Sequence, residues 1–262
     1  MRITLGLVFF LIQFTVLSQI LNIENGNINA DSANFFAGEL NFNFNINNQN
    51  SNKDETIIFK GLDSKLDGIY VGKKHAYILI NQLNYFSSTG GSFISTGYSH
   101  FRINWFRKKT VSYESFTQAQ YDEGRKMPLR WLAGGGLRIK LVDNSKGNVY
   151  LGTGLMYELE HWKNQEIEGG IITKEMLKTT DYLKVQLTFD KISLNSIIYY
   201  QGGYDSQDEM WRSRLDNNTY FNAKITGVLS FVTSFTMQYD FAPIIPIKKY
   251  TYSLTNGLQF NF

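Results

Sequence analysis

The chain has 262 residues, of which 43% are hydrophobic, 15% aromatic and 19% charged, with no Cys and a formal charge of +3. Without Cys there are no disulfides, no thiol catalysis and no cysteine-ligated metal sites. The mean hydropathy of −0.25 argues against a bundle of transmembrane helices. The aromatic content is too high for a disordered chain, and the charge is too small to indicate a nucleic-acid partner.

The N-terminus has the pattern of a signal peptide. One basic residue, Arg2, precedes an apolar stretch from Ile3 to Leu17, and Val16 and Ser18 are suitably small for cleavage after Ser18. We therefore expect a cleaved signal peptide at 1–18, a periplasmic segment at 19–33 and a folded domain at 34–262. A retained anchor helix is the alternative. An exported chain without Cys fits the envelope of a Gram-negative bacterium better than a small secreted domain, which disulfides usually stabilise.

From residue 34 onward, apolar and polar side chains alternate with a period of two, which is typical of β-strands. Twelve such segments are predicted at 34–47, 54–71, 75–88, 93–109, 111–123, 128–142, 147–162, 178–190, 192–204, 216–226, 229–243 and 249–262. The second is the weakest, because residues 61–67 interrupt its alternation. Most segments reach the roughly 9–11 residues that a tilted strand needs to cross a bilayer. The predicted fold is an all-β transmembrane antiparallel barrel, with a soluble lipocalin-like or sandwich protein as the alternative.

The connections between these segments differ in length. Those after even-numbered segments look short, as at Gly72–Lys74 and Asp190–Lys191. Three after odd-numbered segments look long or polar, namely Asn47–Lys53, 163–177 and 202–216. Short turns on one side and longer loops on the other are typical of outer-membrane barrels.

Aromatic residues border the apolar face of the predicted barrel. Trp131 and Tyr157 are examples, and such amphipathic rings favour membrane interfaces. Phe260 and Phe262 end the last alternating segment. This ending resembles the C-terminal signal by which the barrel-insertion machinery identifies bacterial outer-membrane barrels.

Polar residues on the fourth to seventh segments share one face, which would line the interior of a barrel. The candidate interior residues are His100, Arg102, Glu114, Gln118, Gln120, Arg130, Arg138, Glu158 and Glu160. Two interpretations stay open: a network of ion pairs that fills and stiffens a narrow interior, or a polar path or binding surface for a small solute. Small residues at 133–136 and 152–154 leave room for large neighbours or for close backbone approach.

Several of these stretches also carry a family resemblance. They include His75 to Ile80, Tyr113 to Asp122, Leu129 to Arg138 and Leu151 to Glu158. They resemble the domain of unknown function 481 family, whose enterobacterial members are called YdiY-type salt-induced outer-membrane proteins, and they look closest to members from Bacteroidota. The resemblance implies an outer-membrane β-barrel and supplies no activity, ligand or catalytic residue.

Other chemistry has little support in the sequence. The three His residues, His75, His100 and His161, are too far apart along the predicted strands to form a zinc site. Acidic groups near Glu166 and Asp205 are weak candidates for calcium. Ser99 and His100 are adjacent on one strand and point to opposite faces, so they do not form a nucleophile–base couple. We therefore expect no enzyme activity, no cofactor and no metal, with a lipid hydrolase as a remote alternative.

The sequence thus predicts a monomeric outer-membrane barrel in contact with lipid, which is a narrow, porin-like channel or binds a small ion or solute. The alternative is a sealed barrel with a structural or stress-response role.

Overall fold

The computed structural model describes residues 33–52, 55–89, 91–164, 166 and 169–260. The predicted signal peptide, nearly all of the predicted periplasmic segment and Phe262 lie outside these ranges. The described residues form one antiparallel sheet of twelve strands, ordered from first to last as in the chain. The prediction of an all-β fold of about twelve antiparallel strands is confirmed. No described helix is long and apolar enough to span a membrane.

The strands are β1 (Phe35–Asn52), β2 (Glu55–Val71), β3 (Ala76–Ser88), β4 (Gly91–Trp105), β5 (Val111–Asp122), β6 (Met127–Asn144), β7 (Gly147–Lys163), β8 (Ile171–Thr188), β9 (Ile192–Asp205), β10 (Met210–Lys224), β11 (Leu229–Asp240) and β12 (Tyr250–Phe260). Each pairs with its neighbours in the chain, so β1 and β12 are the two edges of the sheet.

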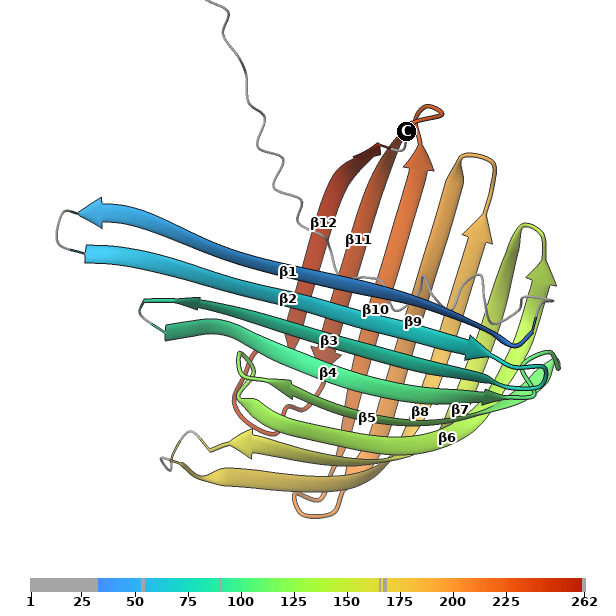
Figure 1. Ribbon diagram of the computed structural model, residues 1–262. Helices are drawn as coiled ribbons and strands as arrows, with labels where there is room; N and C mark the ends of the chain where they lie inside the picture. Colours follow the sequence, from blue (N-terminus) through green and yellow to red (C-terminus); the bar gives the residue numbers. More distant parts are fainter. Residues whose placement is uncertain (1–32, 53–54, 90, 165, 167–168, 261–262) are drawn as a thin grey trace, which may run out of the picture.

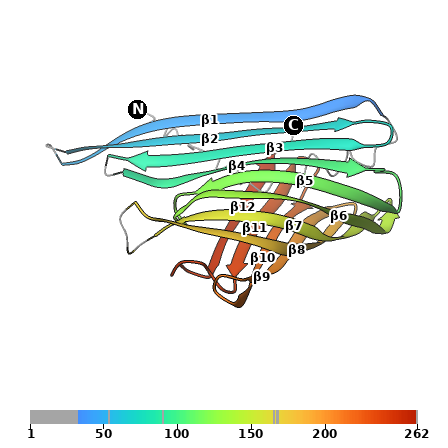
Figure 2. The same cartoon turned by 90° about the horizontal axis from the view of Figure 1, so that it is seen from below.

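The sheet curls strongly, so that β1 to β4 cross in front of β9 to β12 (Figure 1). Figure 2 shows the same two layers from below. We call the end that carries the β1–β2, β3–β4, β5–β6, β7–β8, β9–β10 and β11–β12 connections the loop end, and the opposite end the turn end. The face enclosed by the curl is the inner face. A contact between Arg125 in the β5–β6 connection and Asp240 on β11 joins the two layers at the loop end.

Close backbone packing accompanies the bend of β6 and β7, which curve between the two layers (Figure 1). Gly136 on β6 pairs with Gly154 on β7. A Cβ atom at Gly136 would lie 2.2 Å from the Thr153 carbonyl oxygen, and one at Gly152 would lie 2.0 Å from the Tyr182 ring. The small residues therefore serve both expected purposes, close backbone approach and room for a large neighbour.

Two of the predicted long loops are wrong, because strands occupy most of their residues. β7 continues to Lys163 and β8 begins at Ile171, where the sequence predicted a loop over 163–177. β9 and β10 likewise extend to Asp205 and from Met210, so only residues 206–209 connect them in place of 202–216. The expected polar connection at Asn47–Lys53 is also mostly strand, because β1 extends to Asn52.

The physical reason is that charged residues in these stretches face the inside of the sheet. Lys174, Asp205 and Arg212 are all buried and paired, although their polarity suggested exposed loops. The same reason explains β2, which is continuous through residues 61–67. Lys65 and Asp67 keep its period of two, because both are buried on the inner face, 2.8 Å apart, while Leu66 between them is exposed.

Candidate functional site

The inner face carries an unusual density of buried charge. Arg102 on β4, Glu114 on β5 and Glu158 on β7 have only 7%, 8% and 0% of their surface exposed. The opposite face of the same strands exposes large apolar side chains, such as Phe101 and Leu155. Because charged residues are almost never fully buried unless they are paired, the inner face should contain compensating partners.

The structure places all nine candidate interior residues on the inner face. Six of them line one cavity: His100, Arg102, Glu114, Gln118, Gln120 and Arg130. The other three, Arg138, Glu158 and Glu160, are buried outside the cavity lining. Of the two aromatic residues proposed as an insertion signal, Phe260 is 61% exposed at the end of β12, and Phe262 lies outside the described residues.

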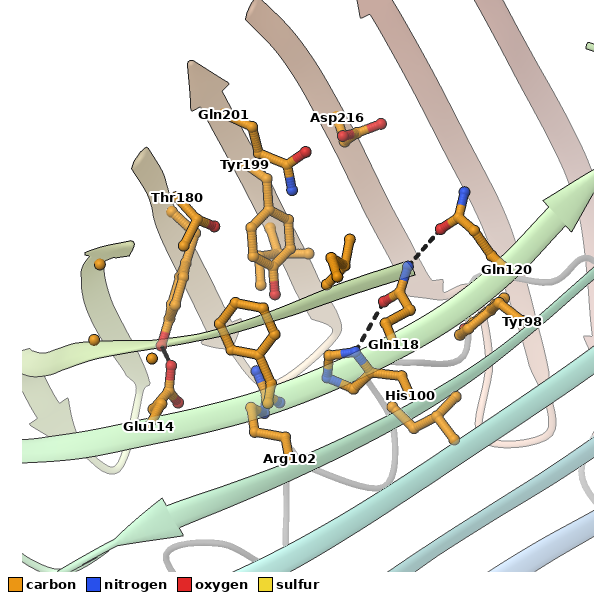
Figure 3. Close-up of a pocket in the computed structure, with 18 of the residues that line it drawn as sticks. Tyr98, His100, Arg102, Glu114, Gln118, Gln120, Thr180, Tyr199, Gln201 and Asp216 are labelled. Atoms are coloured by element: carbon orange, nitrogen blue, oxygen red, sulfur yellow. Dashed lines mark hydrogen bonds between the residues drawn. The ribbon is translucent and has the colours of Figure 1, made fainter. Parts of the chain in front are cut away.

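The cavity has a volume of about 290 Å³ and is lined by side chains from β3 to β11 (Figure 3). His100 and Gln118 approach it from β4 and β5, while Gln201 and Asp216 approach it from β9 and β10 (Figure 3). These strands lie far apart in the order of the sheet, so the curl of the sheet forms the cavity. Its lining mixes carboxamides, hydroxyls and charged groups with the rings of Phe116, Tyr182 and Tyr199.

A chain of hydrogen bonds runs along one wall of the cavity. His100 Nδ1 lies 2.8 Å from Gln118 Oε1, and Gln118 donates to Gln120 over 2.5 Å. Arg130 continues the chain, because its guanidinium donates to Gln120 over 3.5 Å and to Gln201 over 2.9 Å. The wall is therefore a connected polar surface that orients the cavity's amide groups.

Arg130 also belongs to a set of ion pairs between the cavity and the loop end, which we call the ionic layer. Its members are Arg125, Arg130, Glu158, Glu160, Lys178, Arg214 and Asp240. Arg130 Nε donates to Glu158 over 2.6 Å, and Lys178 pairs with the other oxygen of Glu158. Buried carboxylates are stable in such a layer because cations on neighbouring strands compensate them.

Arg214 links the ionic layer across three strands. It contacts Glu160 at 3.1 Å and Asp240 at 2.5 Å, and Trp162 donates an indole N–H to Glu160 over 3.1 Å. Arg125 reaches Asp240 from the β5–β6 connection. The layer thus ties β6, β7, β8, β10 and β11 together near the loop end.

A second charged cluster lies closer still to the loop end. Lys174 contacts Asp205 at 3.3 Å and Asp208 at 2.8 Å, and Arg212 donates to Asp205 over 2.7 Å. Cations therefore hold Asp205 and Asp208, which belong to one of the two acidic groups that had suggested a weak calcium site. Within the ranges that the structure describes, no group of three or more His, Asp or Glu side chains is arranged to hold a metal ion.

The β11–β12 connection, residues 241–249, folds back onto this end. Ile245 is only 3% exposed and packs in a cluster with Met127 and Trp162. Arg212 fixes the start of the connection by donating to the carbonyl oxygens of Ala242 and Pro243, over 2.7 and 3.2 Å. We call residues 241–249 the cap segment.

At the turn end the inner face combines an apolar cluster on β2 and β3 with buried cations, Arg107, Arg138 and Lys184. Ile69, Val71, Ala76, Ile78 and Ile80 form a buried cluster there. Glu114, which lines the cavity, accepts a hydrogen bond from Tyr182 over 2.7 Å and lies 3.8 Å from Arg138. The cavity thus lies between the ionic layer toward the loop end and a mixed apolar and charged region at the turn end.

Sequence reasoning missed half of this interior. Lys178, Arg214, Asp216, Tyr199 and Asp240 all contribute to the cavity or the ionic layer, and none was a candidate. A signal was present, because Lys174, Lys178 and Lys184 alternate with exposed residues such as Leu177 and Leu183 on β8. Extending the parity argument beyond the seventh strand would have found Lys178, Tyr199, Asp216 and Asp240, but not Arg214, which fell in the loop predicted over 202–216.

The structure also separates the one adjacent Ser–His pair. Ser99 is exposed, whereas His100 lines the cavity. Neighbouring strand residues point to opposite faces, as expected from the period of two.

Comparisons with known proteins identify a family and no characterised relative. No curated protein and no solved structure matches this chain. A family model matches residues 37–262, which include all or part of every strand of the sheet. The chain therefore belongs to the family described as protein of unknown function, DUF481.

Proposed function

We propose that this protein is an outer-membrane β-barrel whose interior binds a small polar solute. The observation that carries the proposal is the inverted distribution of polarity. Phe36, Leu40 and Phe42 on β1 are 71%, 69% and 66% exposed, while the ionic layer is buried. Extended apolar surface on a protein points to contact with lipid or a partner, and a wet, charged interior is typical of outer-membrane barrels.

A lipid environment requires the sheet to be closed. Every backbone N–H and C=O group in the hydrocarbon region needs a partner, so the edges β1 and β12 must pair with each other in the membrane. The outward-facing residues of both strands have even residue numbers, as Leu40 and Leu254 illustrate. This shared pattern is compatible with pairing between β1 and β12.

The interior favours a binding site over a wide pore. The cavity offers polar groups on several strands, while the ionic layer crosses the loop end, and the apolar cluster of β2 and β3 together with buried Arg138 and Lys184 occupies the turn end. A solute in the cavity would therefore meet a structured barrier on either side. A channel that conducts continuously would need the ionic layer to open.

A sealed barrel with a structural role is the second candidate, supported by the ionic layer itself. Its many buried pairs would stiffen the sheet whether or not the cavity ever holds a solute. The two candidates differ in one respect: only the first requires saturable binding inside the barrel.

Two experiments test the proposal. First, protein extracted from the outer-membrane fraction should migrate faster on an SDS gel before boiling than after it. Equal mobility in both samples would contradict a closed barrel. Second, the folded protein in a planar bilayer should lack long-lived conductance steps, and at least one small polar solute should raise the temperature at which the folded gel band is lost.

Long-lived conductance steps would overturn the binding proposal in favour of a channel. A silent bilayer without any stabilising solute, tested over neutral, anionic and cationic compounds, would favour the sealed barrel.

A further inference from the structure

Most polar side chains of the cavity lining can both donate and accept hydrogen bonds. It contains five carboxamides, from Gln118, Gln120, Gln201, Asn218 and Gln238. The hydrogen bonds of Gln120 and Gln201 to Arg130 use the amide oxygens as acceptors, which directs the N–H₂ groups to other partners. Gln238 similarly accepts from Arg125 through its oxygen. Thr180 and the phenols of Tyr98 and Tyr199 add hydroxyls.

The charged groups of the lining compensate each other. Two cations, Arg102 and Arg130, face two anions, Glu114 and Asp216. Arg130 is paired with Glu158, and Arg102 interacts with Tyr199 and Glu114. A solute with a net charge would therefore enter a lining whose formal charges sum to zero, and burying such a charge is costly.

Aromatic rings supply apolar surface beside these polar groups. His100 and Phe116 are stacked, with ring centroids 6.1 Å apart and planes at 18°. Tyr182 and Tyr199 lie across the cavity, with centroids 5.3 Å apart. Figure 3 shows the ring of Tyr199 and the side chain of Gln201 side by side on β9. A ring face and an amide group therefore border the same part of the cavity.

The size of the cavity limits the solute. Its volume of about 290 Å³ lies at the lower bound of small-molecule pockets, about 300–1,000 Å³. One small ring fits better than an oligomer.

We infer that the cavity binds a neutral polyhydroxylated solute the size of one sugar ring. Many hydroxyls match the carboxamides, the carboxylate of Asp216 accepts from further hydroxyls, and the aromatic rings contact the C–H surface of the ring. The absence of net charge on the solute matches the compensated lining. The inference rests on the proposed function, because it names the class of solute for the same cavity.

The test is calorimetric titration of the full chain, purified in its folded, heat-modifiable form. The neutral probes are D-glucose, D-galactose and D-xylose, and the charged probes of similar size are D-gluconate and D-glucosamine. At least one neutral sugar should bind saturably with one site. Both charged probes should bind at least about tenfold more weakly, because each brings a charge that the lining does not compensate.

Variants place the binding in the cavity. Gln201→Leu should weaken the sugar's affinity about tenfold, the effect of losing one or two hydrogen bonds. Asn218→Leu, on a neighbouring strand, provides the same test if Gln201→Leu disturbs folding. Gln207→Leu is the matched control, because Gln207 is exposed in the β9–β10 connection and should leave binding unchanged.

The outcomes separate the two proposals. Binding of gluconate or glucosamine as tightly as the best neutral sugar would overturn the inference and leave a solute-binding barrel in place. Sugar binding that survives both cavity variants would also overturn it. A folded protein that binds none of the probes would overturn the inference, and with no stabilising solute of any class it would overturn the proposed function as well.

Discussion

Glu158 has the most demanding position of any carboxylate in the ionic layer. Its side chain is fully buried and is compensated by Arg130 and Lys178 on the two flanking strands. Such a pair is costly to break, because removing one partner leaves a buried charge without compensation. Removing one partner is therefore destabilising because the remaining charge is buried, whatever the number of ion pairs.

Replacing Glu158 with Gln should lower the free energy of unfolding by about 3–5 kcal/mol, since Arg130 and Lys178 lose their shared anion. Urea unfolding in detergent micelles measures this. The matched control is Glu123→Gln, which removes an exposed pair with Lys163 whose side chains are 40% and 48% accessible and should cost at most about 1 kcal/mol. Equal effects of the two substitutions would contradict a buried ionic layer.

The glycines of β6 and β7 also affect stability as single residues, because they allow the two backbones to pack closely. A methyl group at Gly136 would approach the backbone oxygen of Thr153, and a backbone atom cannot rotate away as a side chain does. Gly136→Ala should therefore destabilise the protein by about 1–3 kcal/mol, the usual cost of overpacking.

The control is Gly227→Ala in the β10–β11 turn, where a Cβ atom would meet nothing within 4 Å. The loss temperature of the folded gel band compares the two variants, and an unchanged temperature for Gly136→Ala would show that the two strands can separate slightly.

At the scale of elements, the cap segment is the most consequential connection. It is held by the buried side chain of Ile245, by Ile244 and Ile247, which pack against the same cluster, and by the carbonyl contacts of Arg212. Lys248 and Lys249 within the segment are exposed, so the rate of tryptic cleavage there measures how firmly the segment is held. A connection with few anchors opens locally at a lower cost than the strands do.

Ile245→Ala should remove much of the anchor and speed tryptic cleavage at Lys248 or Lys249, because large-to-small changes at buried sites cost about 2–5 kcal/mol. Ile225→Ala is the control, since Ile225 is 55% exposed at the opposite end and should not change cleavage of the cap segment. Equal cleavage rates of wild type and Ile245→Ala would mean that Ile244, Ile247 and Arg212 hold the segment without Ile245.

At the scale of the whole molecule, closure between β1 and β12 is the main prediction. If the sheet closes, β1 and β12 pair antiparallel to each other. The start of β1 should therefore approach the end of β12. The chain has no Cys, which makes engineered disulfides easy to interpret. Leu40→Cys should form a disulfide with a Cys at one of positions 254, 256 or 258, which share its outward parity, because paired strands bring Cα atoms within the range of a disulfide.

Thr255→Cys is the matched control, because its side chain points to the other face and should not cross-link with Leu40→Cys. Failure of all three outward positions, in protein that is folded by gel mobility, would contradict closure through these two strands.

Much of the interior follows from local rules. Alternation along β4 to β7 is enough to place His100, Arg130 and Glu158 on one face, because successive side chains on a strand point to opposite faces. The same rule failed where a strand carries charges inward near a connection. Lys174, Asp205 and Arg212 then resembled residues of a solvated loop. Their burial could not be predicted, because the sequence does not show which charged partners they contact.

The number of strands, their antiparallel order and the sharing of a face by side chains could all be predicted from the amino-acid sequence, since they depend on a period of two and on neighbours in the chain. Which charges meet could not be predicted in this way, because it depends on how distant strands are brought together. Arg214 contacts Glu160 and Arg125 contacts Asp240 across 54 and 115 residues of chain. Such contacts depend on the curl of the whole sheet, which accumulates from small twists at every strand and brings the cavity-lining side chains of β4 opposite those of β9 and β10.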